Sequence, residues 1–381
     1  MWSRGLLVVL LLLSPLGVSG CWDRIEMNDL AWVMATGIDE AEDGKIRMTL
    51  QIATPANGSS DSPKGKSDQF IVQSAVGKNL HDAQQKIENR MSRQLYEGHR
   101  RIILIGEDLA KRGIKNILDQ YSRDPLSRLR SYILVAKDKR AQEMLQLKYP
   151  FEKAPAEAIR EMALSNNGLG VTLRDFLISA TSLDISPVMG VIEAEGGKNM
   201  HLAGTAIFQN FQLCGYLDEK ETRQLLWLRG EMANRLFTSS IPNKGEVAIE
   251  MTALQQKLEA MPEESPIKFD VKLKVRAMVH ENDTPFNLLS PPNIALIEQS
   301  IAKDMEGQIA KTIAQVQQKY KADVFGFGQE LHRHHPRAWR AHRDRWEELF
   351  PTAEINVSVQ IDLERTGLSG PPLQLDESEV L

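Results

Sequence analysis

Apolar and polar side chains alternate along residues 45–54, where every second position from Ile46 to Ile52 is apolar. Alternation with a period of two predicts a β-strand that buries one face and exposes the other. Shorter apolar runs without alternation predict strands that are covered on both faces. By these two patterns, further strands are expected over residues 30–39, 70–76, 101–105, 132–136 and 187–195, the last of which is expected to leave the first domain.

Helical patterns separate these strands. Helices are expected over residues 78–96, 108–121, 138–147, 157–164 and 173–179. Strands that alternate with helices are typical of an α/β fold, in which helices cover the faces of a sheet. A polar stretch rich in Gly, Ser and Pro at residues 56–68 predicts an exposed loop within this region.

The C-terminal half opens with a strand pair, 202–208 and 211–217, that turns at Gln209 and Asn210, and a helix is expected from Asp218 to about Arg229. Asp218 and Glu221 have the spacing of a capping box, which explains these carboxylates better than a docking surface does. Further strands are expected over residues 247–254, 268–279 and 355–363.

The longest helix is expected from Asn293 to about Lys321. Apolar residues recur there at spacings of three or four and form a single stripe from Ile294 to Tyr320. At about 1.5 Å per residue the helix would be about 43 Å long. After it, Gly326 and Gly328 lack the spacing of a phosphate-binding loop, so they are expected to end the long helix and turn the chain while Phe325 and Phe327 enter the core.

These elements predict a multidomain protein of the mixed α/β class, with mixed β-sheets flanked by helices. We expect an N-terminal α/β domain over residues 21–196 and a C-terminal α/β domain over residues 197–368, which either stays whole or divides near residues 280–290. Residues 369–381 are expected to form a flexible tail.

The first twenty residues have the pattern of a secretory signal peptide. Arg4 precedes a leucine-rich block, Gly5 to Leu13, and small residues follow. Nine residues in a helix reach about 14 Å, which is too short for a hydrocarbon core of about 30 Å.

Val18-Ser19-Gly20-Cys21 fits the bacterial lipobox, in which the cysteine thiol takes up a diacylglyceryl group and becomes the first residue after cleavage. Two acyl chains hold a protein stably at a membrane. The alternatives are a plain secretory signal with a chance cysteine, or an uncleaved anchor. Trp22, Asp23 and Arg24 follow Cys21 directly and are candidate contacts with the membrane or a partner.

The charge balance argues against nucleic acid as a partner. The chain carries 46 basic and 51 acidic residues, a net charge of −5, and removal of residues 1–20 would take away only Arg4. Cys214 would then be the one remaining thiol, so no disulfide within the chain is expected. It lies in an apolar strand pattern, which predicts a buried and inert side chain.

Four histidines near the C-terminus invite a metal hypothesis: His332, His334, His335 and His342. No cysteine or HExxH spacing accompanies them, so we predict no metal site. His335, Trp339, His342 and Trp346 recur at steps of four, three and four, which favours a packing stripe bordered by histidines.

Arginines surround this stripe, and Asp344 is the one acidic residue among residues 332–346. Arg337, Arg340 and Arg343 are candidate contacts with an anionic membrane surface or with an acidic partner, and the alternative is a solvated basic face. GxSxG, Walker A and HExxH motifs are absent from the sequence, so neither a catalytic centre nor a cofactor is predicted.

Several stretches together resemble the Ger(x)C family, the lipoprotein C subunits of spore germinant receptors. The matching blocks occur in the family's order from the lipobox nearly to the C-terminus, whereas Ile25 stands where the family often has a charged residue. The blocks are GCWDRIEMNDL (20–30), ATGIDEAEDGKIRMTLQIATP (35–55), EGHRRIILIGEDLAKRGI (97–114), SRDP (122–125), AGTAIF (203–208), CGYLDEKETRQLLWLRGE (214–231), ADVFGFG (322–328) and ELFPTAEINVSVQIDLERTGL (348–368).

The resemblance implies a non-enzymatic protein anchored through Cys21 in the outer leaflet of the spore inner membrane, beside an A subunit and a transporter-like B subunit. It also implies a role in receptor assembly and germination signalling. The alternative is an extracytoplasmic lipoprotein that binds a small molecule and serves a transporter, which would show two comparable lobes.

Overall fold

The computed structural model describes residues 26–54, 70–124, 127–147, 149–165, 169–196, 199–231 and 236–365. Cys21, Trp22, Asp23 and Arg24, the loop expected at 56–68 and the tail expected at 369–381 lie outside these residues. Within the described ranges, no helix combines the length and apolar character needed to cross a membrane.

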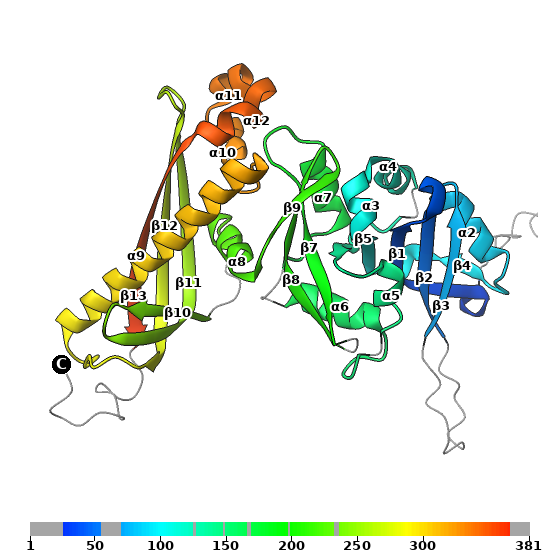
Figure 1. Ribbon diagram of the computed structural model, residues 1–381, viewed down its shortest axis with the longest axis horizontal. Coiled ribbons are helices and arrows are strands. Elements are labelled where there is room, and N and C mark those ends of the chain that lie inside the picture. Colours follow the sequence, from blue (N-terminus) through cyan, green and yellow to red (C-terminus); the bar gives the residue numbers. More distant parts are fainter. Residues whose placement is uncertain are drawn as a thin grey trace, which may run out of the picture.

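The first sheet is mixed and nine-stranded within the described residues (Figure 1). Four neighbouring strands at its centre are parallel, and the two strands that follow on either side of them along the sheet pair antiparallel. In spatial order the strands are β3 (Phe70–Gly77), β2 (Ile46–Ala53), β1 (Leu30–Glu40), β5 (Ile102–Gly106), β6 (Tyr132–Ala136), β7 (Val188–Glu195), β8 (Asn199–Gln209) and β9 (Gln212–Leu217), while β4 (Gln94–Tyr96) pairs with the start of β1.

Helices cover both faces of this sheet, as its apolar strands require. One face packs against residues of α2 (Leu80–Glu88), α3 (Glu107–Arg112), α4 (Lys115–Arg123) and α7 (Leu173–Ala180). The other packs against α5 (Ala141–Met144) and α6 (Pro155–Leu164). Ile103 and Leu104, adjacent residues of β5, point into opposite cores and are both fully buried. The expected α/β class is therefore confirmed.

Three of the expected helices are shorter than their patterns suggest. The one expected over 78–96 ends at Glu88, and β4 follows it. The one expected over 108–121 breaks at Gly113, whose φ of +117° no helix contains. The one expected over 138–147 is reduced to the single turn of α5. The strand at 187–195, expected to leave the domain, is instead an interior strand paired on both sides.

Among the described residues, the second sheet has four strands, and the longest helix packs across it. Its strands in order are β10 (Leu236–Ile241), β11 (Gly245–Met261), β12 (Lys268–Asn282) and β13 (Glu354–Arg365). Helix α9 (Pro291–Gln315) packs against it, as Figure 1 shows, and the π-helical turn Val316–Tyr320 continues α9 at its C-terminal end. Ile297, Ile301, Met305, Ile309 and Ile313 form the buried stripe of α9, so the expected long amphipathic helix is confirmed.

The boundary expected between residues 196 and 197 falls between two paired strands of the first sheet. Strands β7 and β8 on either side of it pair antiparallel, from Val188 with Ile207 to Glu195 with Asn199. The first sheet therefore includes chain from both sides of that position. Near 280–290, where a second division was considered, Phe286 and Leu288 belong to the same core as α9 and the second sheet.

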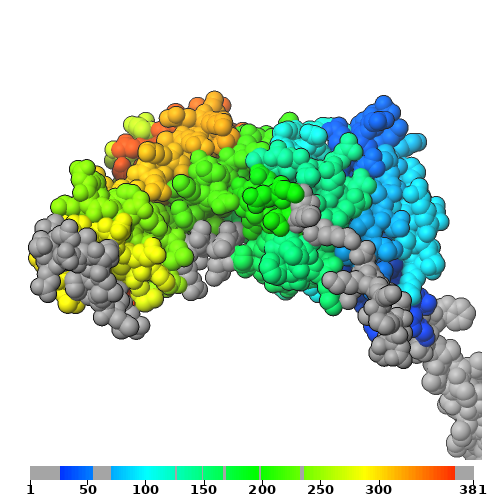
Figure 2. All heavy atoms as spheres, turned by 60° about the horizontal axis from the view of Figure 1, so that its bottom comes forward, coloured from blue at the N-terminus to red at the C-terminus, as the bar shows by residue number. Residues whose placement is uncertain are grey.

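Helix α8 (Glu219–Leu228) connects the two sheets. Asp218 and Glu221 form the expected capping box at its start, with the Glu221 N–H donating to Asp218 over 2.8 Å and the Asp218 N–H donating to Glu221 over 2.9 Å. Trp227 is fully buried in a core that also contains Ile207 of the first sheet and Val247 of the second. Figure 2 shows one elongated body, in which the green middle of the chain lies between the yellow and orange part and the cyan and blue part.

Candidate functional site

The arginine-rich segment near the C-terminus forms α10 (Phe327–His334), α11 (Pro336–His342) and α12 (Trp346–Leu349). Trp339 and Trp346 are buried, and their rings meet edge to face with centroids 5.9 Å apart. Trp346 also lies edge to face with Phe269 of the second sheet, at 6.2 Å. The expected tryptophan packing is thus confirmed.

Arg337, Arg340 and Arg343, which we call the arginine face, are all exposed. Arg343 lies 3.4 Å from a carboxylate oxygen of Asp344, which is itself 77% exposed. Arg337 and Arg340 pair with no carboxylate in the described part of the chain. The three guanidinium groups are therefore accessible to a membrane surface or to a partner.

The four histidines do not gather. His332 Nδ1 lies 2.6 Å from a carboxylate oxygen of Asp184, and His334 Nε2 lies 3.8 Å from one of Glu330. The His332 ring also stacks on Trp339, with centroids 5.6 Å apart. Among the described residues, no group of three His, Cys, Asp or Glu side chains is placed to hold a metal ion.

Asp323 is the most strongly bonded buried carboxylate in this region, and only 3% of it is exposed. Its two oxygens accept hydrogen bonds from the N–H groups of Phe325, Gly326, Phe327 and Gly328, at 2.7–3.3 Å, and from Trp346 Nε1 at 3.2 Å. Burial raises the pKa of the carboxyl above its ordinary value, and these hydrogen bonds oppose that effect.

This arrangement explains the FGFG stretch. The long helix already ends at Tyr320, where Lys321 has a φ of +53°, so the glycines shape the following turn. Gly326 has a φ of +92°, which favours glycine. Phe325 and Phe327 are 5% and 1% exposed, as expected for residues that enter the core.

The turn at residues 323–328 also contacts the loop before β7, and so links the second sheet's part of the molecule to the first sheet. The Ser186 N–H donates to the Asp323 carbonyl oxygen over 2.7 Å. A Cβ on Gly328 would lie 2.6 Å from the Asp184 carbonyl oxygen, so only glycine allows this approach. Arg229, just after α8, donates through Nε and Nη2 to the Val324 carbonyl oxygen at 3.0 and 2.7 Å.

A second set of contacts, one hydrogen bond and one packing contact, joins the end of the long helix to β9. The Tyr320 hydroxyl donates to the Tyr216 carbonyl oxygen over 2.9 Å. A Cβ on Gly215 would lie 2.0 Å from Cε1 of Tyr320, so the ring packs directly on the strand backbone. We call the contacts around Asp323 and Tyr320 the junction. It holds the two sheets in a fixed arrangement.

A cleft of about 930 Å³ opens beside the junction. Its walls come from the end of α8, from β11, from Phe325 and Gly326, and from α10. Charges of both signs line it, among them Arg229, Lys257 and Arg333 against Glu231, Glu259 and Glu330. Such a mixed lining has no single ligand preference, so we assign it no ligand.

The Cys214 side chain is not buried, although its sequence pattern predicted burial. It is exposed, because it lies on β9 at the edge of the first sheet. Its Sγ donates a hydrogen bond to the Ile207 carbonyl oxygen over 3.3 Å, and partial burial of the sulfur raises the pKa of the thiol to about 11. The thiol therefore stays protonated at neutral pH and is a poor nucleophile.

Sequence reasoning did not identify Asp323 or Tyr320 as junction residues. Asp323 stands in the ADVFGFG block, three positions before Gly326, and an Asp side chain at the start of a turn commonly accepts hydrogen bonds from backbone N–H groups that follow it. Tyr320 appeared only as one more residue of the apolar stripe. The close approach to Gly215 depends on long-range packing that no local pattern shows.

The fold and the junction define a class of protein with two α/β parts, which in the described ranges are built on a nine-stranded and a four-stranded sheet that a shared helix joins. The same fold occurs in the crystal structure of the GerBC protein. That structure aligns with a TM-score of 0.61 and 18% identity over 86% of this chain and 96% of that chain.

Two family models match the chain, and together they cover most of its length. "Spore germination protein N-terminal domain" matches residues 23–194, and "Spore germination B3/GerAC like, C-terminal" matches residues 203–367. The chain belongs to the GerAC, or Ger(x)C, family of spore germination proteins.

Curated relatives agree with this over nearly their whole length. Spore germination protein KC of Bacillus subtilis (strain 168) is 28% identical, with 98% of each chain covered. The putative spore germination protein YfkR of the same organism is 27% identical, covering 94% of this chain and 96% of the relative. Spore germination protein B3 of that organism is 23% identical, covering 93% and 96%. None of these names describes an enzyme.

Proposed function

We propose that the chain is the membrane-anchored, non-enzymatic lipoprotein subunit of a spore germinant receptor. Its role would be to assemble with the integral-membrane A and B subunits at the outer face of the spore inner membrane and to support germination signalling. The observation that carries this proposal is the paired family match, which begins at residue 23, two positions after Cys21, and extends to residue 367.

The architecture supports an assembly role. The junction fixes two α/β parts relative to each other through buried contacts, so the molecule presents both to partners as one rigid surface. The alternative, a small-molecule-binding lipoprotein for a transporter, would show two comparable lobes. The described sheets instead have nine and four strands and different connections, which disfavours that alternative.

Replacing Cys21 with alanine is expected to remove the protein from spore membrane fractions and to abolish co-purification of two multi-spanning membrane proteins. The physical reason is that the two acyl chains on the thiol supply stable membrane binding, which a short signal segment does not. Affinity purification from spore membranes, followed by protein identification, measures both effects.

Cys214→Ala is the matched control, because it removes the other cysteine of the chain from an exposed position. It should leave both readouts unchanged. Recovery of wild type with an ABC permease, or with no membrane protein, would contradict the receptor assignment. If the Cys21 variant stayed in membranes together with its partners, the lipid-anchor proposal would be contradicted, but the receptor assignment would not.

The arginine face is the second element of the proposal, as a contact for an acidic surface of a receptor subunit. Changing Arg337, Arg340 and Arg343 together to glutamine should lower co-purification of the partners about tenfold, since three charge contacts of about 0.5 kcal/mol each amount to about 1.5 kcal/mol, and a tenfold change in affinity corresponds to about 1.4 kcal/mol. Membrane recovery should not change, because the lipid anchor is intact.

A control variant with the same loss of charge uses exposed cations elsewhere: Arg93→Gln, Lys115→Gln and Lys220→Gln. Equal partner loss in both triple variants would mean that net charge, and not the arginine face, governs association. Normal partner recovery in the arginine-face variant would reject this surface as the contact.

A further inference from the structure

A pocket of about 500 Å³ on the first sheet is lined mainly by basic side chains, and neither the junction nor the arginine face includes it. Six of the residues that line it are basic or imidazole side chains: His99, Arg101, Arg128, Arg130, Arg160 and Arg174. We call it the arginine pocket.

The pocket lies at the amino ends of the central parallel strands. Arg101 directly precedes β5, and its N–H donates to the Met34 carbonyl oxygen of β1 over 2.8 Å. Arg130 stands two residues before β6, and Tyr132, the first residue of β6, forms a bridge to Thr172. Because β1, β5 and β6 are parallel, the segments that precede them meet at one edge of the sheet.

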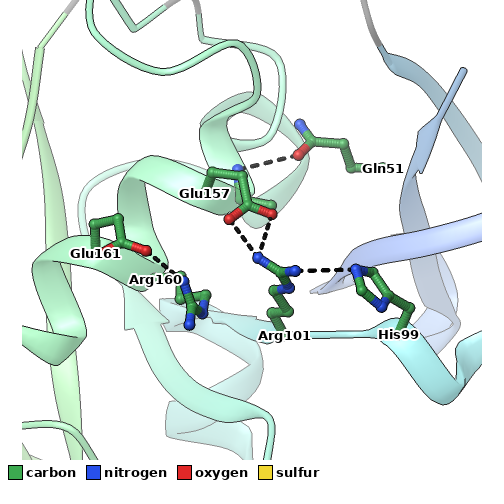
Figure 3. A network of polar contacts seen from close by, with 7 residues as sticks. Gln51, His99, Arg101, Glu157, Arg160 and Glu161 are labelled. Carbon is green, nitrogen blue, oxygen red and sulfur yellow. Dashed lines mark hydrogen bonds and ion pairs between the residues drawn. The ribbon is translucent and has the colours of Figure 1, made fainter. Parts of the chain in front are cut away.

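Part of the pocket's charge is already balanced. Arg101 Nη1 donates to both carboxylate oxygens of Glu157, at 2.9 and 2.6 Å, and its Nη2 lies 3.1 Å from His99 Nε2, as Figure 3 shows. Arg160 pairs with Glu161. The Asp175 carboxylate in the pocket accepts from the Thr172 hydroxyl over 2.6 Å as part of a capping box.

The remaining positive charge is not balanced. Arg128 donates to the Gly98 carbonyl oxygen over 3.3 Å, but no carboxylate of the described residues pairs with Arg128, Arg130 or Arg174. The pKa of His99 lies below its ordinary value because burial disfavours the imidazolium and the nearby Arg101 and Arg128 repel it. Three guanidinium groups thus line a concave site in which Asp175 is the one carboxylate among the lining residues, so positive charge is in excess.

Phosphate groups are the anions that suit this site. A guanidinium group presents a planar set of donors that binds phosphate through two parallel hydrogen bonds, and several arginines together favour a phosphate over a single carboxylate. A bound phosphate would also relieve the mutual repulsion of the unpaired arginines.

The position of the chain start indicates where such phosphates come from. The described chain begins at Glu26 and enters β1 at Leu30, at the same edge of the sheet as the arginine pocket. Cys21 is five residues before Glu26, and five residues span at most about 18 Å. An anchor at Cys21 therefore holds this edge close to the bilayer surface.

The same edge carries the side chains expected at a membrane interface. Met27, Tyr96 and Leu129 are 74%, 40% and 40% exposed. Trp32 packs edge to face against Tyr96, with ring centroids 4.9 Å apart, and against His99 of the pocket at 5.6 Å. Trp and Tyr are enriched where protein meets lipid headgroups, because their rings are apolar at one end and polar at the other.

We propose that the amino edge of the first sheet faces the membrane and that the arginine pocket binds the phosphate of anionic phospholipid headgroups. The inference rests on the anchoring through Cys21 proposed above, and it adds an orientation: the sheet stands with its central parallel strands pointing away from the bilayer. Each arginine close to an anionic leaflet contributes about 1 kcal/mol to such binding.

The test uses the full chain, reconstituted in phosphatidylcholine vesicles with or without phosphatidylglycerol. Phenylglyoxal modifies accessible arginines, and mass spectrometry of peptides gives a rate for each one. Phosphatidylglycerol should slow modification of Arg128, Arg130 and Arg174 about fivefold, which corresponds to about 1 kcal/mol per contact. Arg337 and Arg340 serve as internal reference residues, and their rates should not change.

A variant carrying Arg130→Gln and Arg174→Gln should lose the phosphatidylglycerol protection of Arg128, whereas the control variant Lys115→Gln and Lys220→Gln, with the same loss of charge, should retain it. Both pairs are exposed, so unchanged thermal unfolding should show that each variant folds. Equal modification rates of the pocket arginines in both kinds of vesicle would overturn the proposal that the arginine pocket binds lipid phosphate. Equal protection by inorganic phosphate in phosphatidylcholine vesicles would overturn the lipid assignment and leave a site for a free anion.

Membrane anchoring through Cys21 is measured separately, by flotation with the same vesicles. If the Cys21→Ala chain floats with vesicles as well as wild type does, the anchoring proposal fails. If flotation depends on Cys21 while the pocket arginines stay reactive, only the present inference fails.

Discussion

Replacing Asp323 with alanine is expected to lower the free energy of unfolding by about 3 to 5 kcal/mol, the range for removing one side of a buried charged network. The carboxylate accepts from four backbone N–H groups and from Trp346 Nε1, and alanine would leave all five donors buried without a partner. A buried donor without a partner costs about 1 to 3 kcal/mol, and relaxation of the turn keeps the total below the sum. Urea unfolding followed by tryptophan fluorescence measures the change.

Two comparisons sharpen this result. Asp323→Asn keeps one oxygen acceptor, so its loss should be smaller than that of the alanine variant. Asp344→Ala removes a carboxylate that is 77% exposed and should change stability by less than about 0.5 kcal/mol. A loss below about 1 kcal/mol for Asp323→Ala would show that the turn does not depend on the carboxylate.

Replacing Gly215 with alanine is expected to cost about 1 to 3 kcal/mol, the usual range for an overpacked site. The new Cβ would lie 2.0 Å from Tyr320 Cε1, so either the ring or β9 must move, and the Tyr320 hydroxyl bond to Tyr216 would be strained. Tyr320 is 7% exposed and sits where the long helix meets the first sheet, which leaves the ring little room to move.

A double-mutant cycle tests this explanation. In a Tyr320→Ala background the clash is absent, so Gly215→Ala should become neutral or slightly stabilising, because alanine restricts the unfolded chain more than glycine does. Equal costs of Gly215→Ala in both backgrounds would mean that the glycine is required for a reason other than contact with Tyr320.

The sequence predicted most strands of the first sheet well. Their apolar patterns reflect burial on one or both faces of the sheet, and these faces are buried in the structure. It also predicted α8 through its capping box and α9 through its stripe. Helix lengths were overestimated between residues 78 and 147. The polar residues there continue a helical pattern, but Gly113 and the pairing of Gln94–Tyr96 with β1 end the helices.

For the candidate sites, too, local features could be predicted from the sequence and long-range ones could not. Local spacing was enough to predict the tryptophan packing and the exposed arginines at 337, 340 and 343. It was not enough for the arginine pocket, whose members come from four separate segments and meet only because β1, β5 and β6 are parallel. Asp184 and Asp323 are 139 positions apart, so the junction around them is equally a product of topology.

The pairing of β7 with β8 has a consequence for how such proteins diversify. Family models match the chain in two segments, yet β7 of the first and β8 of the second are hydrogen-bonded neighbours in one sheet. A genetic exchange that replaced the second segment would give β7 a foreign neighbour along eight residues, and a truncation would leave it as an exposed apolar edge. The two segments are therefore constrained to be inherited together, and their interfaces are constrained to change in step.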